Sequence, residues 1–311
     1  MPELRWGLTV PFGGVPLSEH ADLFRRVEAA GYDDVWTSET AGYDGFTPLA
    51  LAGVHTERLR LGTGVVNPYT RGPAVLAQHC AALADASGGR FVLGLGSSSN
   101  VIVERWNGVP FERPLSRMRE AIEALRPVLS GERGPGGFRL ETPPSAPVPI
   151  VVAALRGKML GLAAELGDGA FTNFLPLSGT SRVAKAFGAP DKELVCRFFC
   201  FPEREEEALP AARRMLVGYA TVPVYAAFFR WLGWGERIDP MVAAWEAGDR
   251  GRALELVPDD LVREVFVFGE PDAQRERLGA FAEAGVTTFV LAPLCEPPAL
   301  AAFIDGVAPR R

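Results

Sequence analysis

Cysteine and histidine are scarce in this chain of 311 residues, and their shortage argues against metal chemistry. There are four cysteines and three histidines. The cysteines fit no zinc-ligand spacing and no CxxC motif, and each histidine lies within a helical pattern without another ligand type beside it. We therefore expect no metal site. We expect the thiols to be core residues of a protein that works in the reducing cytoplasm.

Lysine is equally rare, because only three of the 32 basic residues are lysines. A Schiff-base enzyme therefore has three candidates, Lys158, Lys185 and Lys192. Acidic residues outnumber basic ones by 38 to 32, and the net charge of −6 argues against a nucleic-acid partner. No apolar run approaches the ~20 residues of a membrane span. The first 14 residues lack the order of charges and apolar residues of a cleaved signal peptide. We expect a cytoplasmic protein that binds no membrane.

One local pattern recurs along the chain: a helix ends at a glycine and a short apolar strand follows. The pattern occurs at 28–36, 165–171 and 283–290. Glycine suits the left-handed position that stops a helix, and a link of two or three residues then starts a buried strand. Repetition of this unit predicts an α/β protein with parallel strands.

The order of the predicted elements indicates the fold class. Strands are predicted at 4–10, 33–38, 59–65, 91–95, 148–153, 168–172, 193–201 and 286–292. Helices are predicted at 17–30, 45–55, 73–86, 114–130, 156–166, 178–188, 271–284 and 297–307. Eight strand–helix units in about 310 residues fit a (β/α)8 TIM barrel. The competing doubly wound sheet would carry a GxGxxG turn after its first strand, and residues 11–16 lack one.

Residues 202–265 interrupt this alternation and have a wholly helical pattern that is rich in aromatic side chains. We expect one domain over 1–311, with this segment as a helical insertion after the seventh strand. The aromatic residues of the segment include Phe228, Phe229, Trp231, Trp234 and Trp245. The insertion either has a small apolar core of its own or covers the mouth of the barrel and supplies aromatic walls to a substrate pocket, and both can hold.

Barrel enzymes work at the carboxyl ends of their strands, so the segments that follow the strands are where chemistry is expected. These segments are rich in glycine and hydroxyl groups, with one cationic cluster at Arg156-Gly157-Lys158. Glycine and serine let a backbone approach phosphate closely, and the start of a helix adds free N–H groups. Each such turn alone can be a plain tight link. Three such turns lie on one rim, and one of them carries two cations. A phosphate-binding site and plain tight links are therefore equal alternatives.

Glu39 is the only acidic residue at the end of the first six predicted strands. It either bonds a neighbouring loop N–H, as a structural residue, or contacts a cofactor ring or assists proton transfer. No histidine falls on this rim, so no Ser/His/Asp or Cys/His set can be assembled and covalent hydrolase chemistry is not expected. A Schiff-base aldolase is also disfavoured, because Lys158 starts a helix.

Five segments together resemble the luciferase-like monooxygenase superfamily and, within it, the oxidoreductases that depend on the deazaflavin coenzyme F420. The segments are AGYDDVWTSE at 30–39, LGTGVV at 61–66, ASGGRFVLGLG at 86–96, RMREAI at 117–122 and GDG at 167–169. Each is degenerate, and their order and spacing carry the resemblance over nearly the whole chain outside 202–265. The resemblance implies a (β/α)8 barrel, commonly a homodimer, with an insertion after strand seven near the active site.

The resemblance also implies a cofactor site. Many relatives that use F420 have a non-prolyl cis peptide in the bulge that backs the deazaflavin ring, which maps to Gly64–Val65. The loops after strands four and five bind the phosphate tail, and Arg182 and Lys185 are further candidates for this acidic tail. The predicted cofactor-binding residues are Ser38, Glu39, Gly64, Val65, Val66, Ser97, Ser98, Ser99, Ala153, Ala154, Arg156, Gly157, Lys158, Thr172 and Asn173.

The implied reaction is hydride transfer between C5 of the deazaflavin and a small, hydrophobic or aromatic organic substrate, with the redox chemistry carried by the cofactor. The acid and base of sugar-phosphate-oxidising relatives are replaced here by Ser99 and Thr40, so we do not expect that activity. The proton donor is unassigned. Glu39 and Thr40 are the predicted catalytic residues, and Tyr43 is a further candidate.

Two alternatives stay open. A monooxygenase of the same fold would use reduced FMN and O2, and it would consume oxygen, with which deazaflavins react poorly. A non-catalytic relative that binds a flavin or deazaflavin would explain why the usual acid and base are absent.

Overall fold

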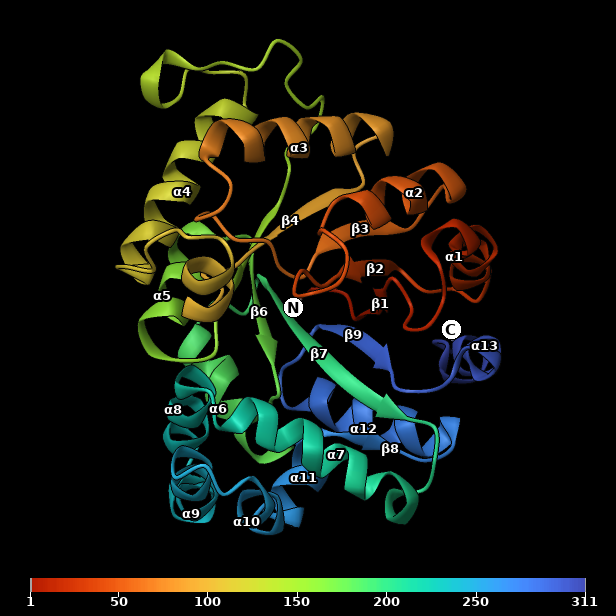
Figure 1. Cartoon of the computed structure of the whole chain (residues 1–311). Helices are drawn as coiled ribbons and strands as arrows, with labels where there is room; N and C mark the ends of the chain where they lie inside the picture. The colour runs from red at the N-terminus through yellow and green to blue at the C-terminus, as the bar shows by residue number, and fades with distance from the viewer. Residues whose placement is uncertain (1, 311) are drawn as a thin grey trace.

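The structure is a computed structural model that describes residues 2–310. Within that range the strands are β1 (Arg5–Val10), β2 (Asp34–Thr37), β3 (Arg60–Thr63), β4 (Phe91–Leu95), β5 (Ile150–Ala153), β6 (Gly169–Asn173), β7 (Glu193–Phe201), β8 (Val267–Phe268) and β9 (Thr288–Pro293). The strands pair in parallel in the order β6-β5-β4-β3-β2-β1-β9-β7, and β6 also pairs with β7. The eight longer strands therefore close into a barrel, and the predicted (β/α)8 class is confirmed (Figure 1).

Eight helices surround the barrel, each within a few residues of its predicted range. They are α1 (His20–Ala29), α2 (Thr47–His55), α3 (Pro73–Ala86), α4 (Pro114–Leu129), α5 (Gly157–Leu166), α6 (Leu177–Phe187), α12 (Pro271–Glu283) and α13 (Leu300–Val307). Short 3-10 turns lie at Leu17–Glu19, Pro135–Gly137 and Pro297–Ala299, and a π-helix after β4 spans Val101–Trp106. Neither this π-helix nor the two-residue β8, which pairs with the end of β7, was predicted from the sequence.

Helix α4 shows how the local sequence sets an element and its packing. Proline occupies its first position, where the missing N–H leaves no bond unmade. Met118, Ile122 and Leu125 recur at helical spacing and are all fully buried against the core. The helix ends before Gly131, whose φ of +81° is the left-handed conformation that glycine adopts at little cost.

The interior of the barrel is filled by large side chains from alternating strand positions. Trp36 of β2 and Phe171 of β6 meet edge to face, with ring centroids 5.4 Å apart, and valines from β4, β5, β7 and β9 complete the layer. The indole of Trp36 fits because β3 has a glycine opposite it: a Cβ on Gly62 would lie 2.2 Å from Trp36 Cε3. The centre of the barrel is thus a packed core.

The amino ends of the strands are closed by a cluster of charges. Arg60 of β3 bonds Asp34 of β2 at 2.8 Å and Glu193 of β7 at 2.5 Å, and Arg5 of β1 bonds the other oxygen of Asp34 at 2.5 Å. Burial opposes ionisation of Asp34, but Arg60 and Arg5 outweigh it and hold the pKa of this carboxyl below its ordinary value. The opposite end, where the strands finish, is left for a functional site.

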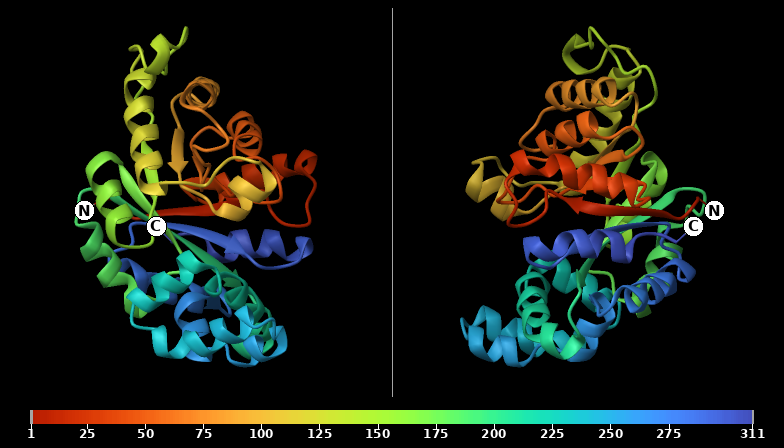
Figure 2. Two further views of the ribbon diagram at one scale, coloured as in Figure 1. Left: turned by 60° about the vertical axis from the view of Figure 1, so that its left-hand side comes forward. Right: turned by 90° about the vertical axis from the view of Figure 1, so that its right-hand side faces the viewer.

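Residues between β7 and β8 form five helices: α7 (Glu205–Ala220), α8 (Pro223–Trp231), α9 (Gly235–Glu246), α10 (Arg250–Glu255) and α11 (Asp259–Val265). They gather on one side of the barrel (Figure 2). Their buried cluster includes Phe229 and Met241, and it is continuous with Phe174 and Phe201 of the barrel. On this continuity we propose that the chain forms one domain with a helical insertion at about 202–265. No helix within 2–310 combines the length and the apolar character that crossing a membrane requires.

Candidate active site

A bulge after β3 forms the centre of the barrel mouth. The Gly64–Val65 peptide bond is cis, which confirms the expectation that the family resemblance implied. The Gly64 N–H donates to the Thr37 carbonyl at 2.8 Å, and the Gly96 N–H donates to the Val66 carbonyl at 2.9 Å. A Cβ on Gly96 would lie 2.5 Å from a methyl group of Val65. Glycine at this position lets the bulge lie directly against the end of β4.

Arg197 of β7 crosses the mouth and supports this bulge from inside the barrel. Its Nη2 donates to the carbonyls of Gly64 and Thr37, the latter at 3.3 Å, and its Nη1 donates to Ser38 Oγ at 3.3 Å. The guanidinium also lies over the ring of Phe171, 5.6 Å from its centroid. Within 2–310 it has no carboxylate partner, and burial lowers its pKa from the ordinary value. The guanidinium ties the ends of β2 and β3 to β7.

The Glu39 side chain is engaged by its neighbours. Both of its oxygens accept from Arg71, at 2.6 and 2.7 Å, and Oε1 also accepts from the Gly45 N–H at 3.0 Å. These contacts match the structural alternative for Glu39, in which the carboxylate bonds a neighbouring loop. A bidentate ion pair of this kind fixes the carboxylate as an acceptor and orders the loop that carries Ser38 and Thr40.

A cleft of about 550 Å³ lies between the loops that follow β1 and β2. Its walls are mostly apolar, and Ser38, Thr40 and Tyr43 contribute their side chains from the β2 loop. Thr9 of β1 also lines the cleft, and its hydroxyl, which is shielded from water, has no hydrogen-bond partner in the described chain. The structure therefore brings two of the three candidate proton donors, Thr40 and Tyr43, to one cleft, while Glu39 is held by Arg71.

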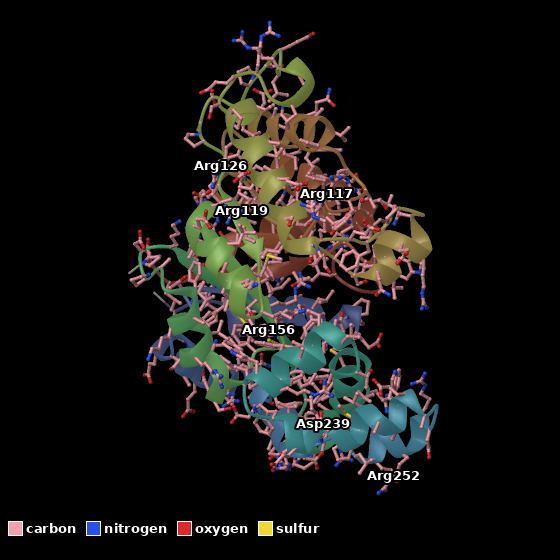
Figure 3. All side chains as sticks on the ribbon, turned by 90° about the vertical axis from the view of Figure 1, so that its left-hand side faces the viewer. Arg117, Arg119, Arg126, Arg156, Asp239 and Arg252 are labelled. Atoms are coloured by element: carbon pink, nitrogen blue, oxygen red, sulfur yellow. The ribbon has the colours of Figure 1, made fainter. Side chains whose placement is uncertain are left out.

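The predicted phosphate-binding loops lie on the same rim. Ser97, Ser98 and Ser99 are half-buried at the end of β4, and Ser98 has a φ of +62°. Arg156, labelled in Figure 3, and Lys158 are both exposed at the start of α5. Neither has an ion pair within 2–310.

The start of α5 is open. No side chain caps its first N–H groups, and Gly157, with a φ of +52°, has no atom within 4 Å of the place a Cβ would occupy. Free N–H groups at a helix start attract a phosphate, and two unpaired cations add to that attraction. This donor set fits the phosphate of an F420 tail.

Other predicted cofactor residues have mixed positions. Val66 and Ala154 are buried, and the Ala154 N–H already donates to the Phe171 carbonyl at 2.9 Å. Ala153 and Asn173 are partly exposed at the strand ends, with Val65 on the bulge. Thr172 needs correction: it is fully buried, and strand alternation directs it away from the interior that Phe171 fills. Its side chain has no access to the mouth.

The two further candidates on α6 are also placed by the structure. Arg182 lies over the ring of Trp231, 4.7 Å from its centroid, and thereby joins α6 to α8. Lys185 is in the last turn of α6, the end that leads to the start of β7, so it lies about 12 Å of helix away from the mouth. The prediction that Lys185 binds the cofactor tail is therefore corrected, because this residue lies far from the mouth.

Sequence reasoning missed Arg197 and its neighbours Tyr219 and Tyr225. A signal was present, because Arg197 is the only charged residue within the apolar run that follows Glu193 in β7. An unpaired charge inside a buried strand points to a functional or strongly hydrogen-bonded position.

The comparisons with known proteins agree with this geometry. The family model described as luciferase-like monooxygenase matches residues 6–288. A Mycobacterium tuberculosis protein, whose name assigns it provisionally to the coenzyme F420-dependent oxidoreductases, is 30% identical over 332 residues, with 93% of this chain and 94% of that protein covered. The 5,10-methylenetetrahydromethanopterin reductase of Methanolobus tindarius is 29% identical over 299 residues, with 88% and 90% covered.

A solved structure has the same fold. The coenzyme F420-dependent tetrahydromethanopterin reductase of Methanopyrus kandleri superposes with a TM-score of 0.77, at 23% identity and with 98% of each chain covered. The match of the family model to most of the chain, together with the relative of 30% identity, establishes the family. The chain belongs to the luciferase-like monooxygenase family.

Proposed function

We propose that this protein is a coenzyme F420-dependent oxidoreductase that transfers a hydride between C5 of the deazaflavin and a small, hydrophobic or aromatic organic substrate. The observation that carries the proposal is the open start of α5, where uncapped N–H groups lie between the unpaired cations Arg156 and Lys158. This site suits an acidic phosphate tail, and it shares the barrel mouth with the Gly64–Val65 bulge. The names of the relatives support F420 over FMN.

The residues of this chain divide into three roles. The bulge at Gly64–Val65 would back the ring, and the β4 and β5 loops would hold the tail. The cleft beside Ser38 and Thr40 would take the apolar substrate next to the ring, since its walls are mostly apolar. When bound, the deazaflavin supplies the hydride chemistry, and the protein orients the partners and moves one proton.

The proton is assigned to a hydroxyl of the cleft. Thr40 and Tyr43 line the cleft, whereas the Glu39 carboxylate is held in its ion pair with Arg71. We therefore place proton transfer at Thr40 or Tyr43, through water where the hydroxyl does not reach the substrate, and we give Glu39 the role of ordering the loop.

Turnover with reduced F420 and a panel of aromatic and apolar compounds tests this function. We expect oxidation of the deazaflavin, followed by its visible absorbance, without uptake of oxygen. Oxygen uptake that requires reduced FMN would support the monooxygenase alternative instead. Tight cofactor binding with no turnover over a broad panel would favour the non-catalytic alternative.

We also propose a cytoplasmic homodimer, as in many relatives of this family. The neighbouring helices α2 and α3 expose Val54 and Val75, which are 74% and 44% accessible in the single chain. Apolar side chains on adjacent surface helices suit a subunit contact. Light scattering after size exclusion should give twice the 33.5 kDa mass of one chain.

A further inference from the structure

Arg197 and Asn173 lie side by side inside the barrel mouth. They are register partners on the neighbouring parallel strands β7 and β6, so their side chains project from the same face of the sheet. Asn173 Nδ2 donates to the Tyr225 hydroxyl at 3.2 Å, which connects the pair to helix α8. Three polar side chains thus meet where the barrel and the helices of 205–265 join.

Two polar atoms of this group have no hydrogen-bond partner within 2–310. They are Nε of Arg197 and Oδ1 of Asn173, and both are shielded from water. The two Nη atoms of Arg197 already bond Gly64, Thr37 and Ser38, which accounts for its support of the bulge. The Nε–H is not needed for that role, and leaving a donor unsatisfied in a buried place is unfavourable.

The charge of Arg197 is also uncompensated. Its side chain is about nine-tenths buried, and the described chain holds no carboxylate within ion-pair distance of it. The cation at the floor of the barrel, Arg60, shows the contrast, because it bonds both Asp34 and Glu193. A buried cation without a counter-charge favours a ligand that brings an electron-rich oxygen.

Aromatic rings form the surroundings of this group. Phe174 lies 4.7 Å from Phe199, 4.2 Å from Tyr219 and 5.6 Å from Tyr225, measured between ring centroids. Burial raises the pKa of Tyr225 to about 12, so its hydroxyl stays protonated and can donate. The polar group therefore has an aromatic surrounding, with donors at one end.

We propose that Arg197, Tyr225 and Asn173 form an oxygen-binding site for the carbonyl group of a planar conjugated substrate, such as an enone, a quinone or an aryl ketone. This inference rests on the proposed function and names the substrate class. The Nε–H of Arg197 and the hydroxyl of Tyr225 donate to the substrate oxygen, and Oδ1 of Asn173 accepts from the hydroxyl of the product. The substrate oxygen reaches this site from the cleft beside Ser38, whose hydroxyl accepts from Arg197 Nη1.

In the reaction proposed for this site, the reduced deazaflavin would be the reductant. A hydride forms a C–H bond at the carbonyl carbon or at the conjugated carbon, and the π-electron pair moves to the oxygen. The oxygen becomes an alkoxide or enolate, which the guanidinium stabilises, and it then takes one proton that Thr40 or Tyr43 delivers through water. Donors aimed at the atom where negative charge develops are an effective catalytic device.

A phenol that changes colour on ionisation tests this site without turnover. We choose 4-nitrophenol, whose phenolate resembles the charged oxygen and absorbs at longer wavelength than the phenol. The full-length protein, with F420 bound and without it, is titrated at a pH where most of the free probe is protonated. We expect the bound probe to be ionised, with the phenolate at least tenfold tighter than the phenol.

Variants assign the effect to these residues. Arg197→Met should abolish the preference for phenolate, and Tyr225→Phe, which keeps the ring, should weaken phenolate binding several-fold. If Arg197→Met does not fold, Arg197→Lys and Tyr225→Phe carry the test. The matched control is Arg230→Met, an exposed α8 residue paired with Asp239, which should bind the probe as the wild type does.

Three results would overturn the inference: no probe binding, binding of the neutral phenol, or an unchanged preference in Arg197→Met. Loss of F420 affinity in Arg197→Met with the phenolate preference intact would also overturn it, because Arg197 would then only support the cofactor platform. Failure of the wild type to bind F420 would instead overturn the proposed function, and the two failures are thereby distinguishable.

Discussion

Asp34 and Arg197 are both buried charges at opposite ends of the same barrel, and their partners give them different roles. Asp34 is fully buried, and two arginines bond its two oxygens. Arg197 has only neutral acceptors within the described chain, and its Nε has none. A compensated charge at the strand starts serves folding, whereas an uncompensated one at the strand ends is suited to a ligand.

Replacing Asp34 by Asn tests the folding role. The variant leaves Arg5 without its carboxylate and Arg60 with Glu193 alone, so we expect a loss of about 3–5 kcal/mol in the free energy of unfolding. Urea denaturation followed by circular dichroism measures it. Asp22→Asn, in an exposed ion pair with Arg25, is the control and should match the wild type.

The stability that Asp34→Asn removes depends on pH, and the lowered pKa of Asp34 gives the direction of this dependence. Because the pKa of Asp34 is lowered on folding, its contribution is complete above the unfolded-state pKa of about 3.9 and is lost as pH falls through the lowered value. The difference in stability between the wild type and Asp34→Asn should therefore be constant at neutral pH and shrink below about pH 4. A difference that grows in acid would contradict this account of Asp34.

Glu39→Gln tests whether this residue orders its loop. A neutral amide bonds Arg71 and the Gly45 N–H less strongly than the carboxylate does, so we expect the Gly45 amide to exchange roughly tenfold faster or more. Hydrogen exchange of a peptide that covers 38–46 measures this rate. Glu57→Gln, at an exposed acid, is the control. Unchanged exchange in Glu39→Gln would refute the ordering role.

At the scale of elements, glycines decide how closely the strands approach at the mouth. Gly94 of β4 lies so near β3 that a Cβ there would be 1.7 Å from the Thr63 carbonyl oxygen. Backbone atoms cannot move aside as a flexible side chain can. By contrast, Gly161 of α5 is exposed in a helix, with no atom within 4 Å of its Cβ position.

Replacing these two glycines by alanine should therefore change the stability of the fold in opposite directions. Gly94→Ala should destabilise the fold by about 3 kcal/mol or more, because β3 and β4 must separate. Gly161→Ala should stabilise it by roughly 0.5–1 kcal/mol, since alanine loses less backbone entropy in a helix. Urea unfolding midpoints check both, and destabilisation by Gly161→Ala would contradict the open surroundings described for it.

The start of α5 is the second element whose role can be measured. Replacing Arg156 and Lys158 together by alanine should weaken F420 binding about tenfold or more, and it should reduce the dependence of affinity on salt. A deazaflavin without the phosphate tail should bind the variant and the wild type equally. Arg252→Ala, in an ion pair on the distant α10 (Figure 3), is the control. If the double variant lost affinity equally for F420 and for the deazaflavin without the tail, the phosphate tail would bind elsewhere.

For the molecule as a whole, local patterns were sufficient to predict the barrel. The glycine-ended helices and the apolar strands indicated that strands and helices alternate along the chain. All eight barrel strands lie at their predicted positions. The family resemblance placed the bulge at Gly64–Val65. These features depend on short segments, whose patterns the sequence displays directly.

Contacts between distant segments account for what was missed. The pairing of Glu39 with Arg71 depends on two loops 32 residues apart, and that of Asn173 with Arg197 depends on the β6–β7 register. Thr172 was misplaced because the face of a strand end follows from register, which the run of residues does not fix. The net charge of −6 likewise conceals a local pair of free cations at the mouth.

The central claim is that the barrel mouth is a site for coenzyme F420. Its most direct test is titration of the purified protein with F420 and, separately, with FMN, followed by ligand fluorescence. The account predicts F420 binding in the micromolar range or tighter and no binding of FMN. Tight binding of FMN without binding of F420 would contradict it.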